Sequence, residues 1–483
     1  MNQTKLRGIV AAVSGAMMLA AMPAMADSTD DIINALMAKG VLTEEEGALL
    51  MRGRTGEKEA AEAKKKSEVK ASFKDGISFE SADKKIKMSV NGRVQADYRT
   101  FHEQQTDKQA DTWDIRRAYL GVKGTFYDWV DFEATANFVG KNGSSGVGDA
   151  MYVYMLNLRP WEFAQLQFGQ FKQPMTIEEL TSSRFINFTE RSWVTQLAPA
   201  VDRGVMLHGV PTKGVTYAAG FFNGIGTGTD SAGQNVNESA VTNDGKSYTG
   251  RLTVNIAELM DNKDAIAHLG ASYSNSNDNT SSAVTLRSEG RGADIFKTNS
   301  LLAGFDVKRL GLEGVFAYGP FKFQSEYMRA QFENDNVTRL ITNGTGNDHD
   351  IKAWNAAVTW MITGEKYADS YKGGKFDRIR PLNDFNPKGE GKGWGAWEIG
   401  ARYSKLDASD FKDIDETANT IGNAEFNEAR AWTVGIKWIP NANTRFLVDY
   451  ITTKMDCVTI GATCPAAIDD TERALNVRAQ LDF

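Results

Sequence analysis

Apolar and polar residues alternate over most of this chain, and that alternation constrains the fold more than any other feature. It is unbroken in the final segment, Ala474–Phe483, which ends on an aromatic residue. Successive side chains of a strand point to opposite faces, so such a segment forms a strand with one apolar and one polar face. The same pattern recurs at Met88–Tyr98, Ala118–Val122, Phe132–Phe138, Leu252–Ile256, Trp354–Trp360, Trp397–Tyr403 and Trp432–Trp438.

The polar faces of these strands are rich in charge. Arg93, Gln95 and Asp97 share one face of the first strand, and Arg117, Tyr119 and Lys123 share the inner face of the next. The strands of a soluble β-sandwich or β-helix also alternate between apolar and polar residues. Such a fold, however, needs neither aromatic residues at its strand ends nor a polar inner face across so many strands. A water-filled barrel needs both. We therefore predict an all-β fold, an antiparallel transmembrane β-barrel in a bacterial outer membrane.

Short and long connections alternate along the barrel region, as periplasmic turns and external loops do in bacterial barrels. Roughly 400 residues, at about 25 per strand and connection, make around 16 strands, a size that leaves an aqueous channel. The segment Thr363–Lys392 is long where a short turn is expected. It is either one unusually large turn or an additional hairpin.

The N-terminal part of the chain lacks the alternating strand pattern. Residues 1–26 resemble a cleaved signal peptide, with Lys5 and Arg7 before an apolar run too short to span a bilayer. Residues 27–83 form a predicted helical arm and linker, in which Thr43 and Glu46 have the spacing of a capping box. A Glu/Ala/Lys tract at 57–66 could be a solvated linker or a short coiled-coil arm. Residues 84–483 are the predicted barrel domain.

Charge and cysteine content limit the partners and cofactors. The net charge is −7 and becomes more negative when the basic signal segment is removed, which argues against nucleic acid as a partner. Cys457 and Cys464 are close in a polar stretch, and an exported protein meets an oxidising compartment, so we predict a local disulfide. The chain offers few zinc ligands beyond these two, and we expect no metal or cofactor.

Several segments resemble the phosphate-selective porin O and P family, and their order and spacing are more specific than any one of them. They are Asn91–Tyr98, Arg116–Val122, Leu180–Arg184, Glu190–Ser192, Asp202–Gly204 and Val477–Phe483. The resemblance covers nearly the whole mature chain. It implies a 16-stranded trimeric porin whose third external loop folds into the pore.

The resemblance also implies an anion path of basic, hydroxyl and aspartate side chains. Matched residue by residue, the barrel wall contributes Arg93, Arg117, Tyr119 and Asp149, the inward loop contributes Ser182, Ser183 and Arg191, and Lys123 also faces the pore. Guanidinium groups and hydroxyls hydrogen-bond oxyanions well. The alternative is that these polar side chains only solvate a wide pore, that the serines form turns, and that Tyr119 packs at the wall.

One position departs from the family pattern. Phosphate-selective relatives carry a lysine three residues before the paired serines, whereas this chain has Glu179, preceded by Glu178. A carboxylate at ~4 Å in an intermediate dielectric changes the interaction with an oxyanion by several kcal/mol. Both residues therefore weigh against phosphate selectivity, unless they point away from the pore or pair with Arg184 and Arg191.

We therefore expect a passive outer-membrane porin for small hydrophilic solutes, with anions such as phosphate as first choice and a weakly selective or cation-tolerant pore as the alternative. A barrel-embedded enzyme would need a nucleophile and a base. The histidines are in no recognisable nucleophile motif and are expected in loops or near strand ends: His102, His208, His268 and His349. A third class is an adhesin or an envelope-tethering protein that uses its long loops or the N-terminal arm, with peptidoglycan as a candidate partner of the arm.

Overall fold

The computed structural model describes residues 28–52, 69–73, 76–102, 109–139, 151–223, 245–279, 284–297, 305–333, 348–388, 393–410, 426–456 and 469–483. These residues divide into two units, one up to Val69 and one from Lys70 onward. The predicted signal segment 1–26, the Glu/Ala/Lys tract, Asp149, Cys457 and Cys464 lie outside the described residues.

The first unit is helical. Helix α2 (Ser28–Ala38) ends just before Gly40, whose positive φ of 72° allows the chain to turn. A second helix covers residues 44–52. Its start has both hydrogen bonds of the predicted capping box: the Thr43 backbone N–H donates to Glu46 Oε2 (3.0 Å), and the Glu46 N–H donates to Thr43 Oγ1 (3.3 Å). None of the described helices is both long and apolar enough to cross a bilayer.

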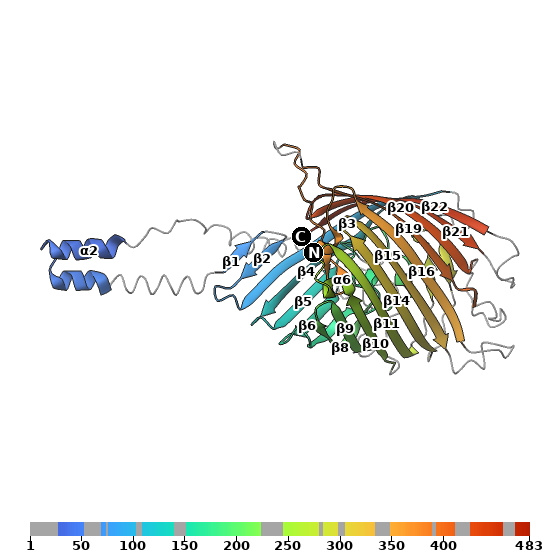
Figure 1. The fold of residues 1–483 in the computed structure, drawn as a ribbon, viewed down its shortest axis with the longest axis horizontal. Coiled ribbons are helices and arrows are strands. Elements are labelled where there is room, and N and C mark those ends of the chain that lie inside the picture. Colours follow the sequence, from blue (N-terminus) through green and yellow to red (C-terminus); the bar gives the residue numbers. More distant parts are fainter. Residues whose placement is uncertain are drawn as a thin grey trace, which may run out of the picture. The chain divides into compact units, whose positions relative to one another are not determined.

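The second unit contains a closed antiparallel barrel of sixteen strands, all within the described residues (Figure 1). Each strand pairs with the next along the chain, and the last pairs with the first, with Leu481 opposite Val94. The strands are β3 (Ile86–His102), β4 (Thr112–Phe126), β5 (Val130–Asn137), β6 (Met151–Leu158), β7 (Gln165–Lys172), β8 (Val201–Thr212), β9 (Val215–Phe222), β10 (Ser247–Asn255), β11 (Ala265–Asn279), β14 (Phe305–Tyr318), β15 (Phe321–Glu333), β16 (Asp348–Met361), β19 (Ala396–Asp407), β20 (Glu428–Asn441), β21 (Thr444–Asp456) and β22 (Asp469–Asp482). The predicted fold class is confirmed.

The two faces of the barrel follow the sequence pattern. Leu252 and Val434 are exposed on the outer face, as lipid-facing side chains must be, whereas the inner-face side chains Arg93 and Gln95 are buried inside. Two details were predicted wrongly. Ile256 begins helix α6 (Ile256–Leu259), because β10 ends at Asn255, where the chain turns. His208 lies in the middle of β8, paired with Gln165, and not near a strand end.

A short hairpin precedes the barrel and extends its wall. Strands β1 (Lys70–Ser72) and β2 (Ile77–Glu80) pair with each other, and β2 pairs with the beginning of β3. The final residue, Phe483, exchanges two backbone hydrogen bonds with Gly92 (2.9 and 3.0 Å). A Cβ atom on Gly92 would lie 2.7 Å from the Phe483 ring, so any larger residue there requires the aromatic ring to shift.

Two segments that follow strands β7 and β11 share an apolar core inside the barrel. The inward loop, residues 173–200, carries the short helices α4 (Ile177–Leu180) and α5 (Trp193–Leu197). The second inward loop, residues 284–297, carries strands β12 (Thr285–Arg287) and β13 (Asp294–Lys297). Trp193 and Leu197 of the first pack in one cluster with Leu286 and Ile295 of the second and with wall residues.

A third segment occupies the opposite end. The long connection, residues 362–395, joins β16 to β19 where the alternation of turns places the periplasmic side. It contains the 3₁₀ helix η4 (Tyr367–Ser370) and a small hairpin outside the barrel sheet. The two strands of the hairpin, β17 (Tyr371–Lys372) and β18 (Lys375–Phe376), have two residues each. The long connection reaches the inward loop, because the Phe376 N–H donates to Thr181 Oγ1 (3.3 Å). The described part of this segment, residues 363–388, is thus one large connection that contains a small hairpin.

Candidate functional site

The barrel wall and the inward loop bring four of the predicted pore residues together. Arg93 on β3 lies 4.0 Å above the ring of Tyr119 on β4. Its Nη1 donates to Ser183 Oγ (2.6 Å) and approaches Ser182 Oγ (3.4 Å). Tyr152 of β6 packs beside Tyr119, with ring centroids 4.9 Å apart. The hydroxyls of the paired serines therefore hold a wall arginine in place.

Arg117 and Lys123 follow on the same face of β4. Arg117 is buried, and its Nη1 donates to Gln95 Oε1 (3.0 Å). Lys123 is solvent-exposed, and together with Glu133 of β5 it lines a cavity of about 720 Å³. Arg117 therefore belongs to a packed polar network, whereas Lys123 is accessible to a solute.

Glu179 is paired with two cations. Its Oε1 lies 2.9 Å from Lys172 Nζ at the end of β7, and its Oε2 lies 3.6 Å from Arg191 Nη1. Arg191 also donates to the backbone oxygens of Glu178 (2.9 Å) and Thr181 (2.8 Å). The carboxylate that departs from the family pattern is thus neutralised locally, and Arg191 braces helix α4.

Glu178 faces a different partner. It accepts hydrogen bonds from the Ser192 hydroxyl (2.6 Å) and backbone N–H (3.1 Å), and lies 3.4 Å from Arg402 Nη1 on β19. Arg402 also pairs with Glu289 of the second inward loop at 2.7 Å. Burial raises the pKa of the Glu289 carboxyl, although the charge of Arg402 opposes that shift.

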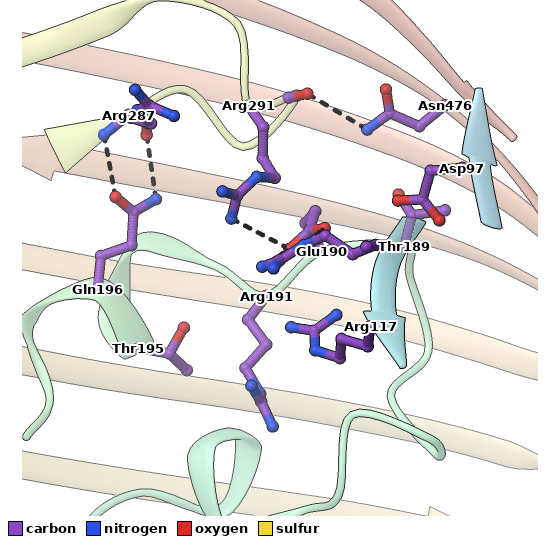
Figure 2. Close-up of polar contacts among 12 residues, drawn as sticks. Asp97, Arg117, Thr189, Glu190, Arg191, Thr195, Gln196, Arg287, Arg291 and Asn476 are labelled. Carbon is purple, nitrogen blue, oxygen red and sulfur yellow. Dashed lines mark hydrogen bonds and ion pairs between the residues drawn. The ribbon is translucent and has the colours of Figure 1, made fainter. Parts of the chain in front are cut away.

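Glu190, which was noted only as part of a family segment, lies at the centre of an arginine cluster, of which Figure 2 shows Arg291. One or other of its carboxylate oxygens lies 2.8 Å from Arg116, 3.1 Å from Arg478, 3.5 Å from Arg99 and 3.9 Å from Arg291. Arg291 reaches it from the second inward loop, and in Figure 2 Arg191 points to the opposite side of the inward loop. We call Glu190 and these four arginines the arginine cage.

The arginine cage carries more positive than negative charge. Asp97 pairs with Arg99 (2.5 Å) and with Arg478 (2.7 Å), and Asp114 lies 3.6 Å from Arg99. Burial alone raises the pKa of the Glu190 carboxyl. The charges of Arg116, Arg291, Arg478 and Arg117 outweigh burial and hold that pKa well below its usual range. Glu190 is therefore ionised, and it is one carboxylate among the four arginines of the cage.

The two inward loops are fastened to each other and to the wall. Gln196 and Arg287 exchange two hydrogen bonds of 3.0 Å (Figure 2). In addition, Trp193 Nε1 donates to the Arg287 carbonyl (2.8 Å). On the wall, Glu472 accepts from the Ser288 hydroxyl (2.6 Å) and the Ala293 N–H (2.7 Å). The charged groups of the two inward loops are thus held on fixed supports.

Comparison with known proteins assigns the barrel. A family model described as "Phosphate-selective porin O and P" matches residues 88–483. The chain belongs to this family. It is also 26% identical over 421 residues to Porin O of Pseudomonas aeruginosa, covering 80% of this chain and 87% of that protein. The match places the protein in the outer membrane as a porin, and it leaves the helices of the first unit outside the family region.

Solved structures are similar at lower identity. OmpT of Vibrio cholerae, expressed in the outer membrane, is 13% identical with a TM-score of 0.47, covering 83% of this chain and 98% of that one. The outer-membrane channel DcaP of Acinetobacter baumannii is 12% identical with a TM-score of 0.48, covering 82% and 97%. Both TM-scores are below 0.5, so the assignment rests on the family match.

Proposed function

We propose that this porin passes small hydrophilic solutes by passive diffusion with a preference for anions, phosphate among them. The observation that carries the proposal is the arginine cage, where Arg99, Arg116, Arg291 and Arg478 surround a single carboxylate of the inward loop. Guanidinium groups are well suited to oxyanions. Arg93, Tyr119 and the paired serines, the residues matched to the anion path of the family, lie together at the same loop.

The runner-up is a weakly selective or cation-tolerant pore. It is favoured by Glu178 and Glu179, which place two carboxylates in the inward loop. The pairing of Glu179 with Lys172 and Arg191 argues against strong repulsion of anions, because the local charge is already balanced. We therefore expect moderate selectivity and not the tight phosphate preference that the family description suggests.

Uptake into proteoliposomes tests the proposal. Vesicles containing the purified full-length porin should take up labelled phosphate faster than a neutral sugar of similar size, and protein-free vesicles should take up neither. Equal uptake of phosphate and a small cation would favour the weakly selective pore. No uptake of any solute would overturn the channel function.

The proposed assembly rests on the family, and the proposed processing rests on the sequence of residues 1–26. We propose that the mature protein forms a homotrimer in outer-membrane lipid. We also propose that its signal peptide is cleaved after residue 26. Cross-linking in mild detergent and N-terminal sequencing of the mature protein test these two points. We also propose that the helical first unit contacts peptidoglycan, which a pull-down comparing the full chain with a variant lacking residues 27–69 would check.

We propose a channel without catalytic activity. The polar inner face and the inward loops serve passage of solutes, and a lipid hydrolase would instead need a nucleophile and a base at the lipid boundary. His208 on β8 is bonded to Asn157 Oδ1 (3.0 Å). A lipase assay on the purified porin should give the same hydrolysis rate as a detergent blank. A faster rate than the blank would support an enzyme instead of a channel.

A further inference from the structure

Three guanidinium groups surround one aromatic ring on the side of the inward loop that faces the long connection. The guanidinium carbons of Arg184, Arg378 and Arg445 lie 5.3, 5.3 and 5.1 Å from the centroid of the Phe185 ring. They come from the inward loop, the long connection and β21. Three parts of the chain thus bring positive charge to a single point at the periplasmic side of the constriction.

Two of the three arginines share one carboxylate as their ion-pair partner. Asp482, at the end of β22, pairs with both Arg378 and Arg445, and Gln480 Nε2 donates to the same carboxylate (2.8 Å). Arg378 and Arg445 also donate to the backbone oxygen of Ala442. These two guanidinium groups are therefore fixed in the wall.

Arg184 differs from them. Its Nε donates to Ser182 Oγ (3.3 Å), and its two Nη groups have no hydrogen-bond or ion-pair partner among the described residues. The side chain is half-buried. Burial and the nearby charge of Arg378 lower the pKa of Arg184, while Asp482 opposes that shift. A half-buried guanidinium with two donors to spare is a group that a counter-anion would stabilise.

Ser182 connects this cluster to the wall arginine. Its Oγ accepts from Arg184 Nε and lies 3.4 Å from Arg93 Nη1. The hydroxyl proton then remains available to an anion. An anion leaving Arg93 would meet the donors of Arg184 next, without crossing an apolar stretch.

We propose that Arg184, flanked by Arg378 and Arg445, is a second anion-binding site of the pore, and that it binds small oxyanions on their way to the periplasm. The inference rests on the proposed channel function for its physiological meaning. The binding itself can be measured without conduction. Loss of the Arg184 fork removes a charge-assisted, bidentate contact while leaving the Asp482 ion pairs in place.

The test compares the full-length wild-type porin with R184Q, R184K and K366Q. Lys366 is an exposed cation on the same long connection, paired with Asp264 (2.6 Å), so K366Q removes the same charge outside the site. Circular dichroism first establishes that the variants keep the wild-type strand content. Calorimetric titration of the detergent-solubilised proteins with inorganic phosphate then gives the dissociation constants.

We expect R184Q to weaken phosphate binding about tenfold or more, R184K to weaken it less, and K366Q to leave it unchanged. Phosphate binding in R184Q equal to wild type would overturn the second site. Equal weakening by K366Q would also overturn it, because the effect would then be one of general charge. Conductance of the wild type is a separate measurement. Its absence would contradict the channel function, and the phosphate titrations would still decide whether the second site exists.

Discussion

Glutamine in place of Glu190 removes the carboxylate charge around which the four arginines of the cage gather, and it should increase the anion preference of the pore. Glutamine keeps an oxygen acceptor for Arg116, which donates to Glu190 Oε1 at 2.8 Å. The loop keeps its neighbouring anchor, because the Thr189 N–H and hydroxyl donate to Asp449 Oδ2 (2.5 and 2.8 Å). The variant therefore changes charge more than shape.

The magnitude follows from Coulomb's law. One unit of charge at roughly 7 Å from a passing ion contributes about 0.6 kcal/mol at the dielectric constant of water and about 2.4 kcal/mol at an effective value of 20. Because 1.4 kcal/mol is about tenfold in an equilibrium, the anion-to-cation permeability ratio should rise at low salt by at least about threefold at the lower energy and about fiftyfold at the higher one. The rise should shrink at high salt, where screening is stronger.

The assay is the reversal potential of E190Q across a potassium chloride gradient in a planar bilayer, beside D261N as the matched control. Asp261 is exposed on a short turn and pairs with Lys213, so D261N removes the same charge outside the pore. We expect E190Q to shift toward anions and D261N to match the wild type. If E190Q conducts normally but keeps the wild-type ratio, the arginine cage does not lie on the ion path.

Three further predictions concern other parts of the pore. Glu179→Lys should raise the anion preference by more than Glu179→Gln, because it reverses a charge that the inward loop now carries; reversal potentials of both variants measure this, and equal ratios would contradict it. Burial raises the pKa of Glu289, so acidification should protonate it before ordinary carboxylates and release the charge of Arg402. Anion preference should therefore rise as pH falls from neutral through the upper part of the carboxylate range, and E289Q should abolish that rise. Gly92→Ala would place a Cβ against the Phe483 ring and should destabilise the barrel closure by about 1–3 kcal/mol, seen as a lower urea midpoint; an unchanged midpoint would show that the ring can move away.

Sequence reasoning reached the barrel because its signal is local. A period of two between apolar and polar residues needs only neighbouring positions, and so does the capping box of Thr43 and Glu46. The same reasoning placed Arg93, Tyr119 and the paired serines near one another, through resemblance to a family. It failed at Ile256, where the alternation continues by chance into a helical turn.

The arginine cage could not be found in the same way. Its members come from β3, β4, β22 and both inward loops, and only the closed register places Arg478 opposite Asp97, next to Glu190. The Arg116–Arg117 pair and Glu190 were visible as family segments, but nothing local shows that they meet. The neutralisation of Glu179 likewise depends on Lys172, whose position at the end of β7 is a property of the fold.

The most direct test of the central claim is the zero-current potential of the purified wild-type porin in a planar bilayer across a potassium chloride gradient, repeated with added phosphate. An anion-selective sign, with current reduced by phosphate, is the predicted result, since the arginine cage and Arg184 outweigh the paired carboxylates of the inward loop. A potential near zero or of cationic sign, with no effect of phosphate, would contradict the account.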